Sequence, residues 1–295
     1  MQDYHILSQS FLQQKKFLGY SYRTEEIALK EIVTFLKGRD ITKEVTEEYA
    51  RMNRNRHSNT IARNMGVLRE FCKYLKTQGV PCYQIPKKIY SQNHRNYTPY
   101  IFSHSEIKTI YQNLEVALKG YHYSYYQKLA YPLVIKILYQ TGMRLGEVLS
   151  IQRQDYLIED GSFHLKNTKN NQERLVFLPN TLKQEMNFFF HKFQHQWEKE
   201  SLIFSISSST IEQYFYKVLK LSHIPRRESS PRVHNLRQTF VVHKIEEYVN
   251  DGKDINVMLP VLQKHLGHQS LEALSYYFHL TKDILGEIRM MSEYE

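Results

Sequence analysis

The segment LGHQSLEALSYYFHL, from Leu266 to Leu280, places a Gly-His pair shortly before two adjacent tyrosines. Upstream, HNLRQTF (His234–Phe240) puts a histidine three residues before an arginine, and TGMRLGE (Thr141–Glu147) puts Arg144 just after a glycine. Two arginines, two histidines and a tyrosine are groups that suit binding a phosphodiester and attacking it. The segments around these motifs indicate the fold class.

Hydrophobic periodicity predicts a mainly α-helical chain with a small β-sheet. Apolar residues recur at spacings of three and four from Ile61 to Leu75, which is typical of one helix. Ser21 and Thr42 are expected to cap two further helices. FHLKN and RLVFLP indicate paired strands, with a turn at Gly161 before them. Other helices are expected over residues 6–18, 129–140, 144–151, 180–194, 210–221, 234–249 and 255–265.

The chain is expected to form two domains joined by a linker. Residues 1–85 indicate helices only, whereas residues 86–100 contain two prolines and little periodicity. Ser103 and Glu106 then have the spacing of a capping box, which opens a second domain over residues 101–295. Residues 281–291 are expected to form a C-terminal tail helix.

The positive charge is concentrated near the N-terminus. The net charge is +10, and residues 1–98 carry 17 lysines and arginines against 9 aspartates and glutamates. This asymmetry favours a polyanion partner, although solubility alone is the alternative. Arg54, Arg56 and Arg63 lie near the start of a helix, where basic side chains suit phosphate contacts. We favour DNA contact over a solvated loop for these three residues.

Several classes of protein are disfavoured by the sequence. It contains no run of about 18 apolar residues and no signal-peptide pattern at the N-terminus, so we expect a cytoplasmic protein. No cluster of carboxylates has metal-ligand spacing, and His191 and His195 lack a third ligand nearby. We therefore expect a side chain, rather than metal-activated water, to be the nucleophile.

Arg144 and Arg237 are the candidates for stabilising negative charge on an attacked phosphate, because a guanidinium can donate two hydrogen bonds. His234 can face the same side of a helix start as Arg237. With 23 tyrosines in the chain, only position after Gly267-His268 singles out Tyr276 and Tyr277.

A lysine on the hairpin could protonate the leaving oxygen. Lys166 and Lys169 are both available, and their chemistry alone does not separate them.

The ordered set TGMRLGE, KNNQERLVFLP, HNLRQTF and LGHQSLEALSYY resembles the tyrosine recombinase (phage integrase) family, especially its short Xer-like members. The N-terminal segments resemble the family's core-binding domain, so the resemblance covers nearly the whole chain. It implies a helical core-binding domain and an α+β catalytic domain that clamp DNA as a C shape.

The resemblance also assigns roles to residues. It makes Tyr277, nine residues after His268, the nucleophile and Tyr276 a packing neighbour. The other catalytic positions are Arg144, Lys169, His234, Arg237 and His268, with Glu147 in a supporting role. Asn170 stands where the family's hairpin has glycine, and it tolerates a left-handed turn.

The family's mechanism implies a 3′-phosphotyrosine intermediate and a Holliday junction, formed without metal, ATP or other cofactor. The implied partner is double-stranded DNA with an inverted-repeat core site, bound by four protomers. The C-terminal helix of each protomer is expected to dock on a neighbouring protomer. In the alternative, this helix caps its own domain. A second recombinase or an accessory protein is compatible with this assembly. Chromosome dimer resolution, phage integration and transposon movement are all compatible with these motifs.

Two other functions compete with recombination. A type IB topoisomerase uses a similar set of residues, but the short helical N-terminal domain favours a recombinase. A DNA-binding regulator without catalysis shares the fold, but the complete set of catalytic residues argues against it.

Overall fold

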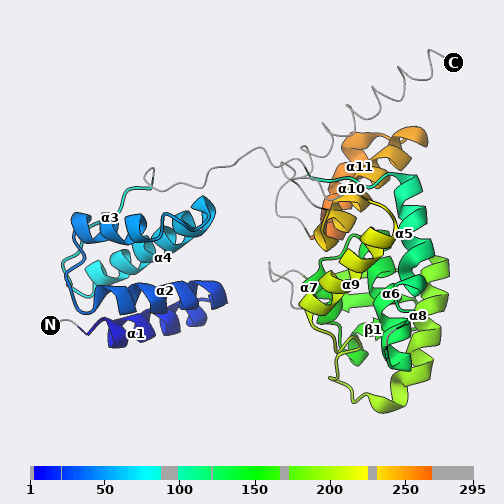
Figure 1. Cartoon of the computed structure of the whole chain (residues 1–295), viewed down its shortest axis with the longest axis horizontal. Coiled ribbons are helices and arrows are strands. Elements are labelled where there is room, and N and C mark those ends of the chain that lie inside the picture. The colour runs from blue at the N-terminus through cyan, green and yellow to red at the C-terminus, as the bar shows by residue number, and fades with distance from the viewer. Residues whose placement is uncertain are drawn as a thin grey trace, which may run out of the picture. The chain divides into compact units, whose positions relative to one another are not determined.

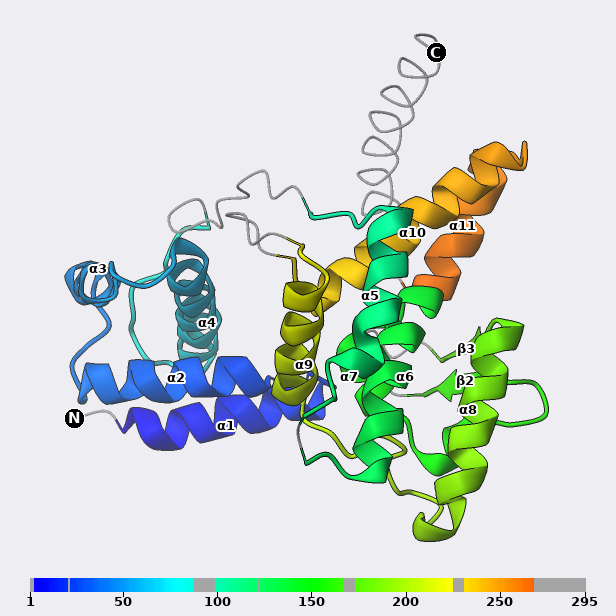
Figure 2. The ribbon, with the colours of Figure 1, turned by 45° about the vertical axis from the view of Figure 1, so that its right-hand side comes forward.

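The computed structural model describes residues 3–20, 22–87, 99–120, 122–166, 173–224 and 231–267. The chain divides into two compact units, Met1–Tyr97 and Thr98–Glu295 (Figures 1 and 2). The described residues are mostly helical and include a three-stranded sheet, which confirms the predicted fold class. None of the helices in these ranges combines the length and hydropathy that a membrane span requires.

In the described residues of the first unit, all regular secondary structure is α-helical. Its helices are α1 (Tyr4–Phe17), α2 (Arg23–Leu36), α3 (Lys43–Met52) and α4 (Ser58–Thr77). The expected apolar stripe of α4 is confirmed, since Met65, Leu68, Cys72 and Leu75 are all buried. The Thr42 side chain accepts a hydrogen bond from Val45 N, as a helix cap should. Ser21, the expected cap of α2, lies outside the described residues.

A buried polar network joins three helices of the first unit. The Tyr49 hydroxyl donates to Glu31 at 3.2 Å and accepts from the Asn64 amide at 3.1 Å. Arg56 forms an ion pair with the same Glu31 carboxylate at 2.8 Å. Burial raises the pKa of Tyr49 to about 12, so its hydroxyl stays protonated at neutral pH and remains a donor.

The chain beyond α4 stays packed on the first unit as far as Pro86. The Arg69 guanidinium donates to the carbonyl oxygens of Ile85 and Pro86, at 2.9 and 3.1 Å. Ile85 is buried in the core of the unit, and Tyr83 N donates to Ile41 O at 2.7 Å. These contacts keep the segment packed on the first unit, although it contains two prolines, Pro81 and Pro86.

The second unit is built around α6 (Tyr125–Thr141), which packs against α5, α8, α9 and α10 (Figure 2). Its residues from Ala130 to Ile135 are all buried, which is typical of a helix surrounded by other helices. The remaining helices are α5 (His104–Val116), α7 (Leu145–Leu149), α8 (Asn180–Phe193), α9 (Ser208–Leu221), α10 (Val233–Asn250) and α11 (Ile255–Leu266), with 3-10 turns at Arg153–Asp155 and Gln194–Gln196.

The ends of α5 and α6 follow from local chemistry. The capping box of Ser103 and Glu106 opens α5, as the sequence predicts. Helix α6 starts at Tyr125 rather than residue 129, because Ser124 and Gln127 form a second capping box. Gly142 ends α6 as predicted, in the left-handed conformation at φ +65°.

The predicted paired strands are confirmed. The sheet contains β1 (Tyr156–Leu157), β2 (Ser162–Leu165) and β3 (Arg174–Phe177), in that order and antiparallel. Phe163 lies opposite Val176, and both are fully buried against the helical core. Gly161 makes the turn between β1 and β2 at φ +65°.

Helices α8 to α11 start and end within two residues of the predicted ranges. The last two helices run side by side and enclose a small core of their own (Figures 1 and 2). Phe240 of α10 and Leu266 of α11 belong to this core, and both also contact the end of α6 near Gly142. The expected tail helix over residues 281–291 lies outside the described residues.

Candidate active site

Three helix ends meet at Gly142. A Cβ atom at this glycine would lie 2.4 Å from Phe240 Cδ1 and 2.9 Å from Leu266 Cδ2, so only glycine fits here. The chain leaves α6 through Gly142 and reaches Arg144, which is the N-cap of α7 rather than part of the expected longer helix. The tight turn brings Arg144 close enough to His234, in the first turn of α10, for its charge to act on the histidine ring.

Arg237 is buried at this junction, with 4% of its surface exposed. Its Nη1 donates to the Gly142 carbonyl at 2.6 Å, and its Nη2 donates to the Leu266 carbonyl at 2.9 Å. Both acceptors stand at helix C-termini, where the carbonyl dipoles favour a positive charge. Arg237 is therefore held in one orientation by the ends of α6 and α11.

Glu147 holds Arg144 in place. Glu147 Oε1 accepts from Arg144 Nη1 at 2.8 Å, and its Oε2 accepts from the Arg144 backbone N–H at 2.9 Å. The nearby guanidiniums of Arg174 and Arg144, together with these hydrogen bonds, keep the pKa of this buried carboxyl below its ordinary value despite the opposing effect of burial. The expected supporting role of Glu147 thus has a geometric basis.

Arg174, at the start of β3, is a buried cation that the sequence analysis did not assign. Its Nη2 donates to Glu147 Oε2 at 2.8 Å, and only 7% of its side chain is exposed. Within the described part of the chain, its Nε and Nη1 are buried without a hydrogen-bond partner. A cavity of about 650 Å³ opens beside it, between β3 and α11, and Lys264 and His265 line its wall. This arrangement leaves positive charge that an anion could neutralise.

His234 lies in the first turn of α10, three residues before Arg237. Desolvation lowers its pKa, and the positive charges of Arg237 and Arg144 lower it further. The ring is therefore neutral at pH 7 and can accept a proton or a hydrogen bond. Because the charges of Arg144 and Arg237 both act on the His234 ring, the three side chains lie near one another.

His265 is a second histidine that the sequence analysis did not assign. Its Nε2–H donates to the Thr141 carbonyl at 2.8 Å, which ties the last turn of α11 to the end of α6. Burial lowers the pKa of this histidine, and the charges of Arg174 and Arg237 act in the same direction. The sequence gives little indication that His265 belongs to a functional site, because histidines in the last turn of a helix often make structural hydrogen bonds.

Gly267 ends α11 directly before His268, in the left-handed conformation at φ +64°. A Cβ at this position would lie 2.8 Å from Arg174 Nη1. We expect Gly267→Ala to destabilise the second unit by about 1–3 kcal/mol more than backbone strain alone, because Arg174 must move. Denaturant unfolding followed by the fluorescence of Trp197, the sole tryptophan, measures this unit selectively.

Gly252→Ala is the matched control for Gly267→Ala. Gly252 has φ +67°, and a Cβ there meets nothing within 4 Å, so the variant carries the strain without the clash. Equal losses of stability in the two variants would show that Arg174 does not constrain Gly267.

The other predicted catalytic residues are placed as follows. Lys166, the alternative to Lys169, forms an ion pair with Asp155 at 3.0 Å, which gives it a structural partner. Lys169, Asn170, His268, Tyr276 and Tyr277 lie outside the described residues. Described residues at this site include no set of three side chains that could hold a metal ion; the set that the structure does contain lies near the start of α5.

The candidate DNA-binding arginines of the first unit differ from one another. Arg54 and Arg63 are exposed, and neither forms an ion pair with another described residue. Arg56 is also exposed, but its ion pair with Glu31 already supports the polar network of the unit. A DNA contact by Arg56 would have to compete with this internal role.

The sequence of the second unit matches a known protein family. Residues 101–283 match the profile described as "Phage integrase family". The chain is 30% identical over 153 residues to tyrosine recombinase XerA of Saccharolobus solfataricus, which covers 52% of this chain and 47% of that protein. It thus spans about half the length of this relative. It is 22% identical over 285 residues to the putative integrase/recombinase y4rE of Sinorhizobium fredii, covering 91% and 89% of the two chains.

Solved structures share the fold. XerH site-specific recombinase bound to palindromic difH substrate, in a post-cleavage complex, has a TM-score of 0.69 at 19% identity and covers 92% of this chain and 79% of that chain. A lambda integrase dimer bound to a COC' core site has a TM-score of 0.61 at 15% identity, with coverages of 92% and 76%. Because the family profile spans most of the second unit and more than half of the chain, this protein belongs to the phage integrase family of tyrosine recombinases.

Proposed function

We propose that this protein is a site-specific DNA recombinase that cleaves and rejoins DNA strands through a covalent 3′-phosphotyrosine at Tyr277. The observation that carries the proposal is the convergence of Arg144, His234 and Arg237 around Gly142, in a chain of this family. A phosphate bound there would meet two guanidiniums whose orientations are already fixed by the protein. Such preorganised donors stabilise developing negative charge without having to rearrange during the reaction.

Each residue has a distinct task in the proposed reaction. Tyr277 attacks the scissile phosphorus, and the bond to the 5′ oxygen breaks. Arg144, Arg237 and His268 bind the non-bridging oxygens, while Lys169 gives a proton to the departing oxygen. His234, which is neutral at pH 7, accepts a hydrogen bond or a proton near the attacking phenol.

Rejoining is the reverse of cleavage. A 5′ hydroxyl from the partner strand attacks the phosphotyrosine and releases Tyr277. The ester keeps the energy of the original phosphodiester, so the exchange consumes no ATP and requires no metal. Positioning of the attacking group in line with the phosphate supplies much of the rate enhancement.

The proposed substrate is double-stranded DNA with an inverted-repeat core site. In the proposed assembly, four protomers bring two sites together and exchange strands in pairs through a Holliday junction. The first unit would bind one face of the duplex as a core-binding domain and the second unit the other. The DNA complexes of XerH and lambda integrase, which share the fold, support a DNA partner.

Covalent capture tests this function. The full-length protein is incubated with fragmented DNA from its own source and denatured in detergent. DNA that remains attached to protein is then recovered and sequenced. We expect 3′-linked adducts clustered at one inverted-repeat site.

Two other outcomes would replace the proposal. Adducts scattered without sequence preference, together with relaxation of any supercoiled plasmid, would indicate a topoisomerase-like enzyme. Sequence-specific binding without adducts, at a site supplied as a nicked suicide substrate that traps cleaved intermediates, would indicate a regulator without catalysis.

The lowered pKa of His234 gives a pH prediction. The ordinary pKa of histidine is about 6.5. Because the pKa of His234 is lowered, its ring stays neutral as the pH falls to 6.5 and is protonated only at lower pH. We expect the single-turnover cleavage rate to stay constant from pH 8 to about 6.5 and to fall at lower pH. His234→Asn should cleave about 100-fold more slowly and lose this acid limb. His191→Asn, an exposed histidine on α8, should keep the wild-type profile.

An unaltered acid limb in His234→Asn would assign the titration to another group. Protein is kept at saturating concentration over DNA, so that changes in binding do not enter the measured rate.

Arg63 gives a second prediction, on DNA affinity. Each phosphate contact that is lost removes about one unit from the slope of log K against log salt. We therefore expect Arg63→Ala to lower this slope by about 1 and to weaken binding at every DNA sequence. Arg23→Ala removes the same charge from the start of α2 and should leave the slope unchanged. Equal slopes in all three proteins would exclude Arg63 from the interface.

A further inference from the structure

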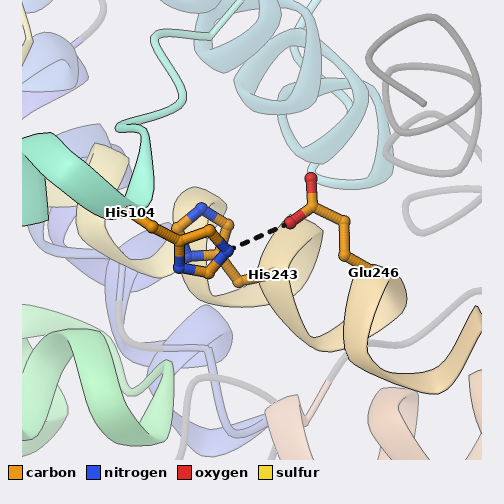
Figure 3. Close-up of side chains that lie close together, drawn as sticks. All are labelled: His104, His243 and Glu246. Atoms are coloured by element: carbon orange, nitrogen blue, oxygen red, sulfur yellow. Dashed lines mark ion pairs between the residues drawn. The ribbon is translucent and has the colours of Figure 1, made fainter. Parts of the chain in front are cut away.

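His104, His243 and Glu246 form a cluster of metal-ligand side chains within the second unit, separate from the candidate active site. His104 is the first residue of α5, whereas His243 and Glu246 lie three residues apart on α10. One ligand atom from each lies within 4.8 Å of the other two, and no other described group of three does so. Figure 3 shows the two imidazole rings stacked beside the Glu246 carboxylate. The ring centroids lie 3.8 Å apart.

The burial of the Glu246 carboxylate suits a cation. Its side chain is only 14% exposed, so its charge needs a partner of opposite sign. Its ion pair among the described residues is with His104, at 3.4 Å, which is charged only when protonated. The adjacent Lys244 pairs instead with Glu247, at 2.7 Å.

The surroundings of His243 orient its ring. Its Nδ1 lies 2.8 Å from the Tyr139 hydroxyl. Because Tyr139 engages Nδ1, the proposed site uses Nε2 of His243 as the metal ligand. A hydrogen bond to the second nitrogen of a histidine is the usual way in which proteins fix the tautomer and direction of a metal ligand.

We propose that His104, His243 and Glu246 bind Zn²⁺, with water as the fourth ligand. Two imidazoles and one carboxylate are a typical zinc set, with bonds of about 2.0–2.2 Å in a tetrahedron. Such bonds require donor atoms about 3.3 Å apart and a nitrogen lone pair of each ring directed at the ion, so the His104 ring must turn out of its stack on His243. His104 can make this adjustment, because its side chain is 73% exposed and lies at the first turn of α5. A cavity of about 530 Å³, lined also by Glu247 and Asp251, gives access to the site.

The proposed ion would act on the conformation of the unit rather than on the phosphate. It would clamp the start of α5, which follows directly on the boundary between the two units, to α10. Helix α10 also carries His234 and Arg237, about two to three turns before the zinc ligands. Zinc binding would therefore stabilise the second unit and reduce the freedom of α5 relative to the catalytic helix.

Isothermal titration of metal-stripped, full-length protein with ZnCl₂ tests the site. We expect one tight binding event in the wild type and at least a tenfold loss of affinity in His104→Ala and in Glu246→Gln. His104→Ala removes an exposed side chain, and Glu246→Gln preserves shape, so neither should unfold the protein. His191→Ala, which removes an exposed histidine from the last turn of α8, should keep the tight event.

The thermal stability of the second unit is a second measurement of zinc binding. At free Zn²⁺ tenfold above its Kd, the Tm followed by Trp197 fluorescence should rise by about 3–6 °C in the wild type. The same addition should leave the Tm of Glu246→Gln unchanged. Absence of zinc binding in the wild type, or equal affinity in the wild type and both cluster variants, would overturn the proposal. Loss of the tight event in His191→Ala would move the site to α8.

Discussion

A Tyr277→Phe variant is expected to bind its DNA site with wild-type affinity and to form no covalent adduct. Phenylalanine keeps the ring and removes only the phenolic oxygen that the proposed mechanism uses as nucleophile. Loss of the nucleophile should lower the cleavage rate by at least about 10⁴-fold, while Arg144 and Arg237 still hold the phosphate. Gel electrophoresis of detergent-denatured complexes on a nicked suicide substrate measures the adduct directly.

Tyr276→Phe is the matched control, because it makes the same chemical change at the adjacent position. We expect this variant to form adducts within about tenfold of the wild-type rate, as suits a packing neighbour. The opposite pattern, with activity lost in Tyr276→Phe and kept in Tyr277→Phe, would move the nucleophile by one residue.

Arg237→Lys is expected to lower the single-turnover cleavage rate by about 10³-fold or more. The planar guanidinium donates to the Gly142 and Leu266 carbonyls at once, which fixes the orientation in which it would meet a phosphate. A lysine ammonium is a single point donor on a flexible stem, so it cannot span both carbonyls and also address a phosphate.

The same substitution should destabilise the second unit. At least one buried carbonyl loses its partner, which costs about 1–3 kcal/mol. Unfolding followed by Trp197 fluorescence measures this loss.

Arg232→Lys is the control for Arg237→Lys. Arg232 is the exposed N-cap of α10, on the same helix, and its replacement should change neither rate nor stability appreciably. Cleavage by Arg237→Lys within about tenfold of wild type would contradict the role given to the guanidinium geometry.

Much of the fold could be predicted because local chemistry agrees with the final packing. The stripe from Ile61 to Leu75, the capping box at Ser103 and the glycine at residue 142 each specify a helix or its end without distant contacts. The start of α6 was missed because Ser124 and Gln127, which form its capping box, lie before the apolar run that defined the prediction. Packing of Ile85 and Pro86 onto the first unit depends on Arg69, which is 16 and 17 residues away in sequence, so local patterns could not predict it.

The candidate site was predictable where spacing carries the geometry. His234 and Arg237 are three residues apart, so their spacing predicts that they share one face of a helix start. The resemblance to the family, rather than local spacing, predicts that Arg144 joins them. Arg174 could not be assigned, because an arginine at the start of a strand is ordinary until Glu147 is known to lie beside it. Arg56 was predicted to contact DNA, and its ion pair with Glu31 was not foreseen, because the two residues are 25 positions apart in sequence.

The central claim is that Tyr277 carries the DNA, and identifying the linked residue tests it most directly. Adducts of the wild-type protein are digested with nuclease and then with protease, and the nucleotide-bearing peptide is sequenced by tandem mass spectrometry. The account predicts a peptide from residues 266–280 with a 3′-linked nucleotide on Tyr277. A nucleotide on Tyr276, on any other tyrosine or on a serine would contradict it.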